Sequence, residues 1–195
     1  MAELADASDS KSDGNTVWVQ VPPSVLILRM NIFVIDNDPV LAAIGLCDKH
    51  IPKMLLESAQ ILSTVSGKLG GPTPYKPTHE HHPCVIWAAQ TYENWFWLAM
   101  HAMALCREYT FRFGKVHASQ AIIVEMVHKG SIPETGSMTP FIQAMPEQYH
   151  KQDAVDAYRS YYLGEKAKFA KWKHGRQSPE WWDKIKVCKK LETVV

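Results

Sequence analysis

The stretch from Asp38 to Val65, DPVLAAIGLCDKHIPKMLLESAQILSTV, is the clearest helical signal in the chain. Asp38 before Pro39 places an N-cap residue ahead of a proline at the first helical position, so we predict that a helix begins there. Pro52 either kinks this helix or begins a second one that runs to Val65. In the second part, apolar or small residues recur at helical spacing and are expected to face the core: Ile51, Leu55, Ser58, Ile61, Leu62 and Val65.

The rest of the chain also has helical character. One further helix is expected to bend at Gly164, where glycine interrupts the pattern. The predicted helices span 84–112, 115–129, 153–173 and 179–190, and the predicted loops span 66–83 and 130–140. We therefore predict a mainly α, compact single-domain helical fold with at most a short N-terminal strand.

The first residues differ in composition from the rest of the chain. They begin with small, polar and acidic side chains, a composition typical of a solvated tail. We predict a flexible N-terminal extension over 1–29 and a single helical domain over 30–195. The sequence leaves open whether Met1 or Met30 begins the working protein.

Composition excludes several classes of protein. With 195 residues, 46% of them hydrophobic, the chain can build its own core, and no apolar run approaches the ~20 residues of a membrane span. Its four cysteines are scattered and nothing resembles a secretory signal, so we predict a cytoplasmic protein. Motifs of the GxGxxG, GxxxxGK[ST], GxSxG and HExxH types do not occur, which disfavours dinucleotide, P-loop, serine-hydrolase and zincin chemistry.

Charge is balanced overall but uneven along the chain. The formal net charge is +1, yet lysine and arginine outnumber aspartate and glutamate in 151–195, while acidic residues are in excess before it. This asymmetry indicates a basic C-terminal surface that suits a polyanion.

One polar stripe of the predicted helix after Pro52 carries candidate catalytic residues. His50, Lys53, Glu57 and Gln60 succeed one another at separations of three, four and three, which places them on one face opposite the apolar one. A glutamate beside a lysine and a histidine can act as a general acid or base with a tuned pKa. The candidates are Glu57, His50 and Lys53. The alternative is a solvated face with a Lys53–Glu57 ion pair.

The loop YKPTHEHHPC, residues 75–84, combines a lysine with three histidines. Lys76, His79 and His82 are candidate phosphate contacts. Zinc also prefers such ligand types, but the H-x-H-H spacing is not a recurrent structural-zinc pattern. We therefore assign no metal and no cofactor, while a metal at this loop and an ordinary loop both stay open.

One face of the predicted 84–112 helix carries Glu93, Trp97, His101, Glu108 and Arg112. Such a face suits a pocket that stacks a base and moves a proton. We take His101 as a candidate catalytic residue, Trp97 as part of a base pocket and Arg112 as a phosphate contact. The alternative places Trp97 and His101 in the core.

A basic and aromatic segment lies near the C-terminus. Arg159, Lys166 and Lys173 repeat every seven residues on one helical face. The neighbouring face is aromatic and carries Tyr158, Tyr162, Phe169 and Trp172. Lysine and arginine bind phosphates, and rings stack on bases. The three cations are therefore predicted phosphate contacts and the two tyrosines predicted base-pocket residues. Core aromatics with solvated charges are the alternative.

These motifs also carry resemblances to known proteins. The D-K-H element at 48–50 with Glu57, the 75–83 loop and the 157–172 segment resemble a family of small uncharacterised bacteriophage proteins over most of 30–182. More remotely, the order of pieces is similar to the phage endonuclease V type of pyrimidine-dimer DNA glycosylases. Those proteins are compact and helical, remove a damaged base and cleave the abasic strand. Their catalytic glutamate lies nine residues after the aspartate of a D-x-H element, so the resemblance gives Glu57 that role.

The nucleophile is where this chain departs from that family. The family uses the α-amine of its N-terminal residue, which forms a Schiff base with the sugar. The corresponding place here lies near 29–31, behind 29 further residues. The resemblance therefore implies either a processed chain or a lysine in the place of the α-amine, with Lys49, Lys53 and Lys76 as candidates.

We therefore expect a DNA-acting enzyme of the base-excision type, a DNA glycosylase and abasic-site lyase for damaged or modified pyrimidines. Its expected partner is DNA or a nucleotide, without a membrane, and a phage-encoded chain would work in the host cytoplasm. Two alternatives stay open: a non-catalytic phage-type protein that binds nucleic acid or nucleotides, and an enzyme that acts on modified nucleotides.

Overall fold

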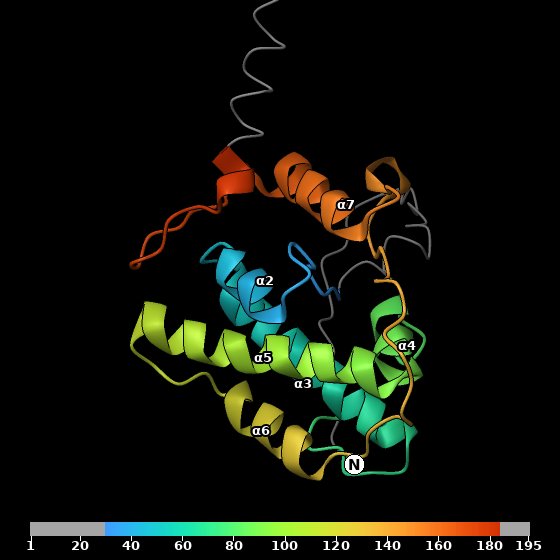
Figure 1. Ribbon diagram of the computed structural model, residues 1–195. Coiled ribbons are helices and arrows are strands. Elements are labelled where there is room, and N and C mark those ends of the chain that lie inside the picture. The colour runs from blue at the N-terminus through green and yellow to red at the C-terminus, as the bar shows by residue number, and fades with distance from the viewer. Residues whose placement is uncertain (1–29, 184–195) are drawn as a thin grey trace, which may run out of the picture.

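The computed structural model describes residues 30–183 (Figure 1), so the predicted extension over 1–29 and the end of the predicted 179–190 helix lie outside the described residues. Residues 30–183 form helices and no strand, which confirms the predicted mainly α fold. The elements are α2 (Pro39–Gly45), α3 (His50–Lys68), α4 (Pro83–Gln90), α5 (Tyr92–Phe113), α6 (Ser119–Lys129), the 3₁₀ turn η1 (Glu147–Tyr149), α7 (Ala154–Tyr161) and the π-helical turn η2 (Tyr162–Lys166). No helix in this range is long and apolar enough to cross a membrane.

The first two helices, α2 and α3, form where the capping residue and the prolines of the sequence predict them. The Asp38 carboxylate accepts the backbone N–H groups of Val40 and Leu41 at 2.8 and 2.9 Å, which caps α2. Pro52 falls in the first turn of α3, where its missing N–H is tolerated, and α3 continues past it. All six residues of the predicted apolar face of this helix are buried.

The predicted 84–112 helix is two helices in the structure. Thr91 has extended backbone angles, and its hydroxyl accepts the N–H of Asn94 at 3.2 Å. This cap starts α5 and separates it from α4, which ends at Gln90. The division results from a capping residue inside an otherwise helical pattern.

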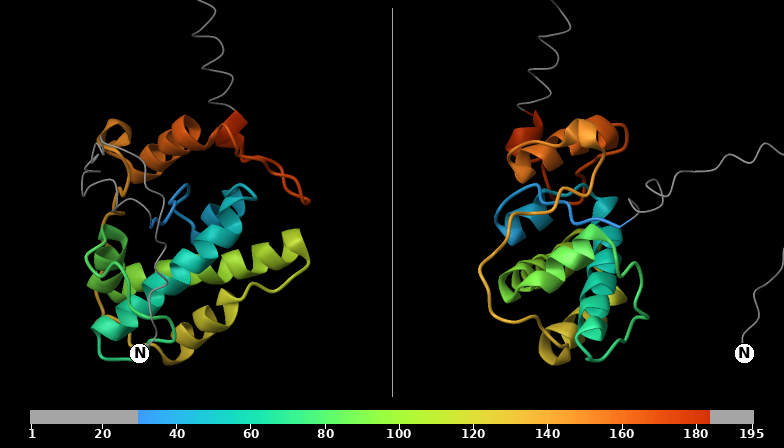
Figure 2. Two further views of the ribbon diagram at one scale, coloured as in Figure 1. Left: turned by 180° about the vertical axis from the view of Figure 1, so that it is seen from behind. Right: turned by 90° about the vertical axis from the view of Figure 1, so that its right-hand side faces the viewer.

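Helix α5 lies at the centre of the molecule. It packs against α2, α3, α4 and α6. In Figure 1, α7 and residues 180–183 lie above α2, and the side view in Figure 2 shows the extended run from residue 30 between α7 and the α3–α5 layer. This run, residues 30–34, is buried, so it forms part of the core between the two layers.

The chain changes helix type after α7. Regular α-helix ends at Tyr161, and a single π turn continues to Lys166. Gly164 lies in this turn, and a Cβ there would overlap the Tyr149 ring, whose hydroxyl donates to Glu165 at 2.9 Å. Glycine is therefore required for the close approach of Tyr149, at the position where the sequence predicts a bend.

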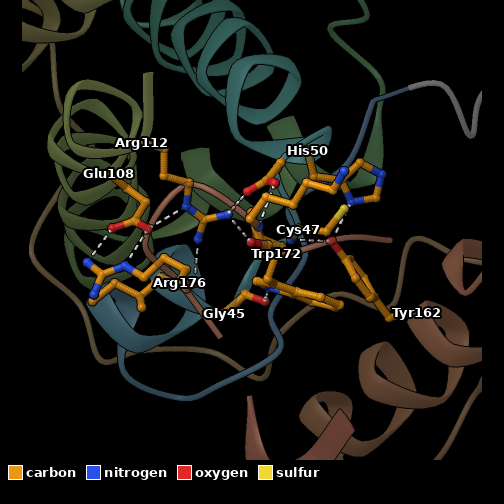
Figure 3. Close-up of polar contacts among 12 residues, drawn as sticks. Gly45, Cys47, His50, Glu108, Arg112, Tyr162, Trp172 and Arg176 are labelled. Carbon is orange, nitrogen blue, oxygen red and sulfur yellow. Dashed lines mark hydrogen bonds and ion pairs between the residues drawn. The ribbon is translucent and has the colours of Figure 1, made fainter. Parts of the chain in front are cut away.

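Residues 170–176 form what we call the C-terminal strap, which runs back over the end of α2. Trp172 Nε1 donates to the carbonyl of Gly45 at 3.1 Å, and the N–H of Lys173 donates to Asp48 Oδ2 at 2.9 Å. Arg176 binds both carboxylate oxygens of Glu108 at 2.8 Å (Figure 3). These bonds fix the strap to α5 and to the end of α2.

His101 lies in the core. Its ring is 0% exposed and stacks on Trp97 with 5.2 Å between centroids, and neither ring nitrogen has a hydrogen-bond partner among the described residues. Burial lowers the pKa of His101 from 6.5 to about 3. The folded protein therefore holds a neutral imidazole at this position.

This buried histidine should make stability depend on pH. Between pH 6.5 and about 3 the unfolded chain protonates His101 and the folded chain does not, so stability falls as the pH falls through this window. His101→Leu should flatten the pH dependence of the unfolding free energy by about 1.4 kcal/mol per pH unit, as measured by urea unfolding. His128→Leu, at an exposed histidine, is the control. If the unfolding free energy depended on pH equally in wild type and His101→Leu, this prediction would be wrong.

Candidate active site

Glu57 is at the centre of the candidate site. Its carboxylate is buried on the polar stripe of α3, where Oε2 accepts the backbone N–H of Asn31 at 3.0 Å and Oε1 accepts from Lys53 Nζ at 2.5 Å. Burial raises the pKa of Glu57, against the opposing effects of Lys53 and Asn31. A carboxyl group with a raised pKa next to two nitrogen atoms is suited to taking up and returning a proton.

His50 opens α3, two turns before Glu57. Its ring stacks on Phe33 with 4.8 Å between centroids, and its Nδ1 lies 2.8 Å from the Tyr162 hydroxyl. Burial, followed by the positive charges of three nearby lysines, lowers the pKa of His50 to about 3. The imidazole is therefore neutral near pH 7.

A cavity of about 340 Å³ opens beside these groups. The Lys166 ammonium donates to the Tyr161 hydroxyl at 3.2 Å, and Lys49 Nζ lies 4.8 Å from the centre of the Phe169 ring. Cations suit phosphates and aromatic rings suit flat bases, so the wall matches a nucleotide. It consists of Asn31, Phe33, Lys49, His50, Lys53, Tyr161, Lys166 and Phe169.

The predicted phosphate loop divides between two places. Lys76 is exposed and lines a second cavity of about 580 Å³ together with Leu56 and Gln60, farther along α3. His79 is exposed, and its charge lowers the pKa of Glu57, which places it near the site. His82 is instead buried as the N-cap of α4, where Nδ1 accepts the N–H of Cys84 at 3.1 Å.

Of the predicted phosphate contacts outside this loop, the structure brings Lys166 alone to the cavity wall. Arg112 is buried and donates to Glu108, to Asp48 and to two backbone carbonyls at the end of α2. Arg159 donates to the carbonyl of Ile35 at 2.9 Å and to Asp36 at 3.3 Å. Lys173 is exposed on the C-terminal strap.

The three predicted base-pocket residues lie in the core and do not line the cavity. Trp97 Nε1 donates to the carbonyl of Asn37 at 2.7 Å, and the Tyr158 hydroxyl donates to the carbonyl of Ile142 at 2.9 Å. Tyr162 is 0% exposed behind His50. Like His101, these residues are brought close to other core side chains rather than to Glu57.

Different aromatic residues line the cavity: Phe169, which the sequence placed on the aromatic face predicted to stack on bases, and Phe33 and Tyr161, which sequence reasoning missed. Tyr158 and Tyr162 share a helical face, and that face is the buried one, so Tyr161 between them reaches the cavity. A usable signal existed for Tyr161, because it lies inside the basic and aromatic segment. Phe33 sits in an apolar run that carries no local sign of a site.

Among residues 30–183, no group of three or more histidine, cysteine, aspartate or glutamate side chains is placed to hold a metal ion. The histidine-rich loop at 79–82 therefore contains no such group within the part that the structure describes.

Comparison with known proteins identifies a family for the segment that carries most of this site. Residues 30–122 match the family model described as pyrimidine dimer DNA glycosylase. No curated protein and no solved structure was found to match the chain. The matched residues contain Asn31, His50 and Lys53, which line the cavity, and Glu57, which Asn31 and Lys53 bind. The family description names DNA as the molecule acted on. Over residues 30–122, just under half of the chain, the protein is thus similar to the pyrimidine dimer DNA glycosylase family.

Proposed function

We propose that this protein removes a damaged pyrimidine from DNA and cleaves the strand at the resulting abasic site, with Glu57 as the catalytic carboxylate. The observation that carries the proposal is the convergence of two nitrogen atoms on this carboxylate, the backbone nitrogen of Asn31 at 3.0 Å and Lys53 Nζ at 2.5 Å. Both residues also line the cationic and aromatic cavity.

Glu57 first takes a proton from the protonated amine, and the neutral amine then attacks C1′ of the damaged nucleotide. The nitrogen–C1′ bond forms as the glycosidic bond breaks, and the base leaves with the bonding electron pair and takes up the proton that Glu57 holds. The amine nitrogen then loses a proton, the sugar-ring oxygen gains one, and the ring opens to a Schiff base. Loss of a proton from C2′ expels the 3′ phosphate and cuts the strand.

Glu57 is the group suited to carry the proton from the amine to the sugar-ring oxygen. Its raised pKa brings the protonated and ionised forms closer in energy near neutral pH than in an exposed glutamate. The reacting nucleotide must leave the base stack to reach a buried carboxylate. Phe33, Tyr161 and Phe169 offer rings against which an extruded base can stack.

Lys53 is the amine that we assign in a chain that begins at Met1. The nitrogen of Asn31 is then a peptide nitrogen, whose lone pair is delocalised into the carbonyl group and is not nucleophilic. Lys49 borders the same cavity but lies over Phe169, and Lys76 borders the second cavity. In a chain that begins at Met30, the α-amine lies one residue from the N–H that Glu57 binds, and it takes this role as the family resemblance implies.

Borohydride trapping tests this proposal. Borohydride reduces a Schiff base to a stable amine, so DNA with an abasic or ultraviolet-damaged site should become covalently joined to the protein. Peptide mapping should place the adduct on Lys53 in the chain that begins at Met1, and on the terminal residue in one that begins at Met30. Lys53→Arg should abolish the adduct in the former, whereas Lys68→Arg, at the far end of α3, should not.

No adduct and no strand cleavage with either form would contradict the proposal. If such a protein still bound DNA with a steep salt dependence, the non-catalytic binding protein would become the better description.

A further inference from the structure

Tyr162 lies behind the candidate site and connects two groups at the start of α3. It stands outside the family-matched residues and contributes nothing to the cavity wall. Its hydroxyl oxygen accepts the backbone N–H of Cys47 at 2.9 Å and lies 2.8 Å from Nδ1 of His50 (Figure 3). Both residues lie more than 100 positions away in the chain.

The Tyr162 hydroxyl has one proton to donate and one good acceptor within reach. The backbone N–H of Cys47 can only donate, so it does not take the proton. The Cys47 side chain also reaches the hydroxyl, but sulfur is a weak acceptor, whereas a bare imidazole nitrogen is a good one. Tyr162 is 0% exposed, so a hydroxyl without an acceptor would leave a buried donor unsatisfied. The proton therefore points to His50 Nδ1.

This bond decides which nitrogen of His50 carries the ring proton. A neutral imidazole has one N–H, and because Nδ1 accepts, the proton must sit on Nε2. The ring is neutral near pH 7, as its low pKa of about 3 indicates. Since Nδ1 is engaged by Tyr162 and His50 lines the cavity, Nε2–H is the group that meets a bound nucleotide.

We propose that Tyr162 is a positioning residue that holds His50 in its Nε2–H form, so that His50 gives the nucleotide a hydrogen-bond donor and not a base. The acceptor is an oxygen of the nucleotide bound in the cavity. That part of the inference rests on the proposed function, whereas the protonation form of the ring does not.

Nitrogen NMR of the free protein reads the form of the ring without any DNA. Wild type should show His50 with the proton on Nε2, assigned by loss of its signals in His50→Gln. Tyr162→Phe keeps the ring and removes the hydroxyl, and it should let the proton distribute over both nitrogens. The matched control is Tyr158→Phe, which also removes a buried hydroxyl from the same segment but one that bonds to backbone groups at residues 142 and 144.

Kinetics separate positioning from general weakening of the fold. Tyr162→Phe should lower kcat for base excision by roughly 10- to 100-fold with little change in KM, because the donor is misplaced only in part of the molecules. Tyr158→Phe should lose stability to a similar extent and keep its kcat. His50→Gln, whose amide nitrogen can donate but cannot act as a base, should be more active than His50→Leu.

Several results would overturn the inference. The first is a wild-type His50 ring that carries its proton on Nδ1. The second is a Tyr162→Phe protein in which the proton distribution of His50 is the same as in wild type. The third is equal base-excision activity of His50→Gln and His50→Leu. If instead the NMR result holds and no form of the protein excises bases, the positioning of His50 stands and the proposed function fails.

Discussion

Glu57→Gln is expected to lower the rate of base excision by about 10²- to 10⁴-fold, the range that a positioned acid or base contributes. Glutamine preserves the shape of the side chain, and its carbonyl oxygen can still accept the N–H of Asn31. It cannot take up and return a proton, and it removes the negative charge that faces Lys53. Single-turnover excision on ultraviolet-damaged DNA measures the effect.

DNA affinity and thermal stability should change far less than the rate in this variant. The matched control is Glu93→Gln, which removes an exposed carboxylate from α5, away from the cavity wall, and should retain full activity. A Glu57→Gln protein that excises bases at the wild-type rate would remove Glu57 from the mechanism.

Arg112→Met should cause the largest loss of stability, about 3–5 kcal/mol, the range for breaking a buried charge pair on one side. The guanidinium has no exposed surface and is 2.6 Å from Glu108 Oε1 and 2.9 Å from Asp48 Oδ1. It also donates to the carbonyls of Ile44 and Leu46 at the C-terminal end of α2, where helix carbonyls lack partners within the helix. Methionine fills much of the volume and satisfies none of these acceptors.

Urea unfolding at neutral pH gives the measurement. Arg107→Met removes an exposed arginine from the same helix and should shift the midpoint only slightly. If the two variants were equally stable, the network around Arg112 in Figure 3 would contribute little to the fold.

The parts of the fold that depend on residues close to one another in the sequence were predictable. The Asp38 cap and the periodic apolar face of α3 are local patterns, and the helices formed where these patterns stand. The same periodicity placed His50, Lys53 and Glu57 on one stripe, and in the structure His50 and Lys53 line the cavity while Glu57 is bound to Lys53. Helical spacing was sufficient because all three lie on one element.

Long-range contacts were beyond that kind of reasoning. The N–H of Asn31 reaches Glu57 across 26 residues, and nothing near Asn31 in the sequence signals it. Arg112 and Arg159 have the charge of phosphate contacts, but backbone carbonyls and carboxylates of distant segments already occupy them. The π turn after Tyr161 changes the register of the residues after it, so α-helical spacing could not place Lys166 and Phe169.

The cavity wall comes from two parts of the chain, so the two parts of the wall are made at different times during synthesis. Asn31, His50 and Lys53 leave the ribosome well before Tyr161, Lys166 and Phe169, which lie more than 100 residues later. A nascent chain thus carries the Lys53–Glu57 pair before it has the second part of the cavity wall. Residues 170–176, which dock through Trp172 and Arg176, are also made late, so the cavity is complete only after most of the chain has been synthesised.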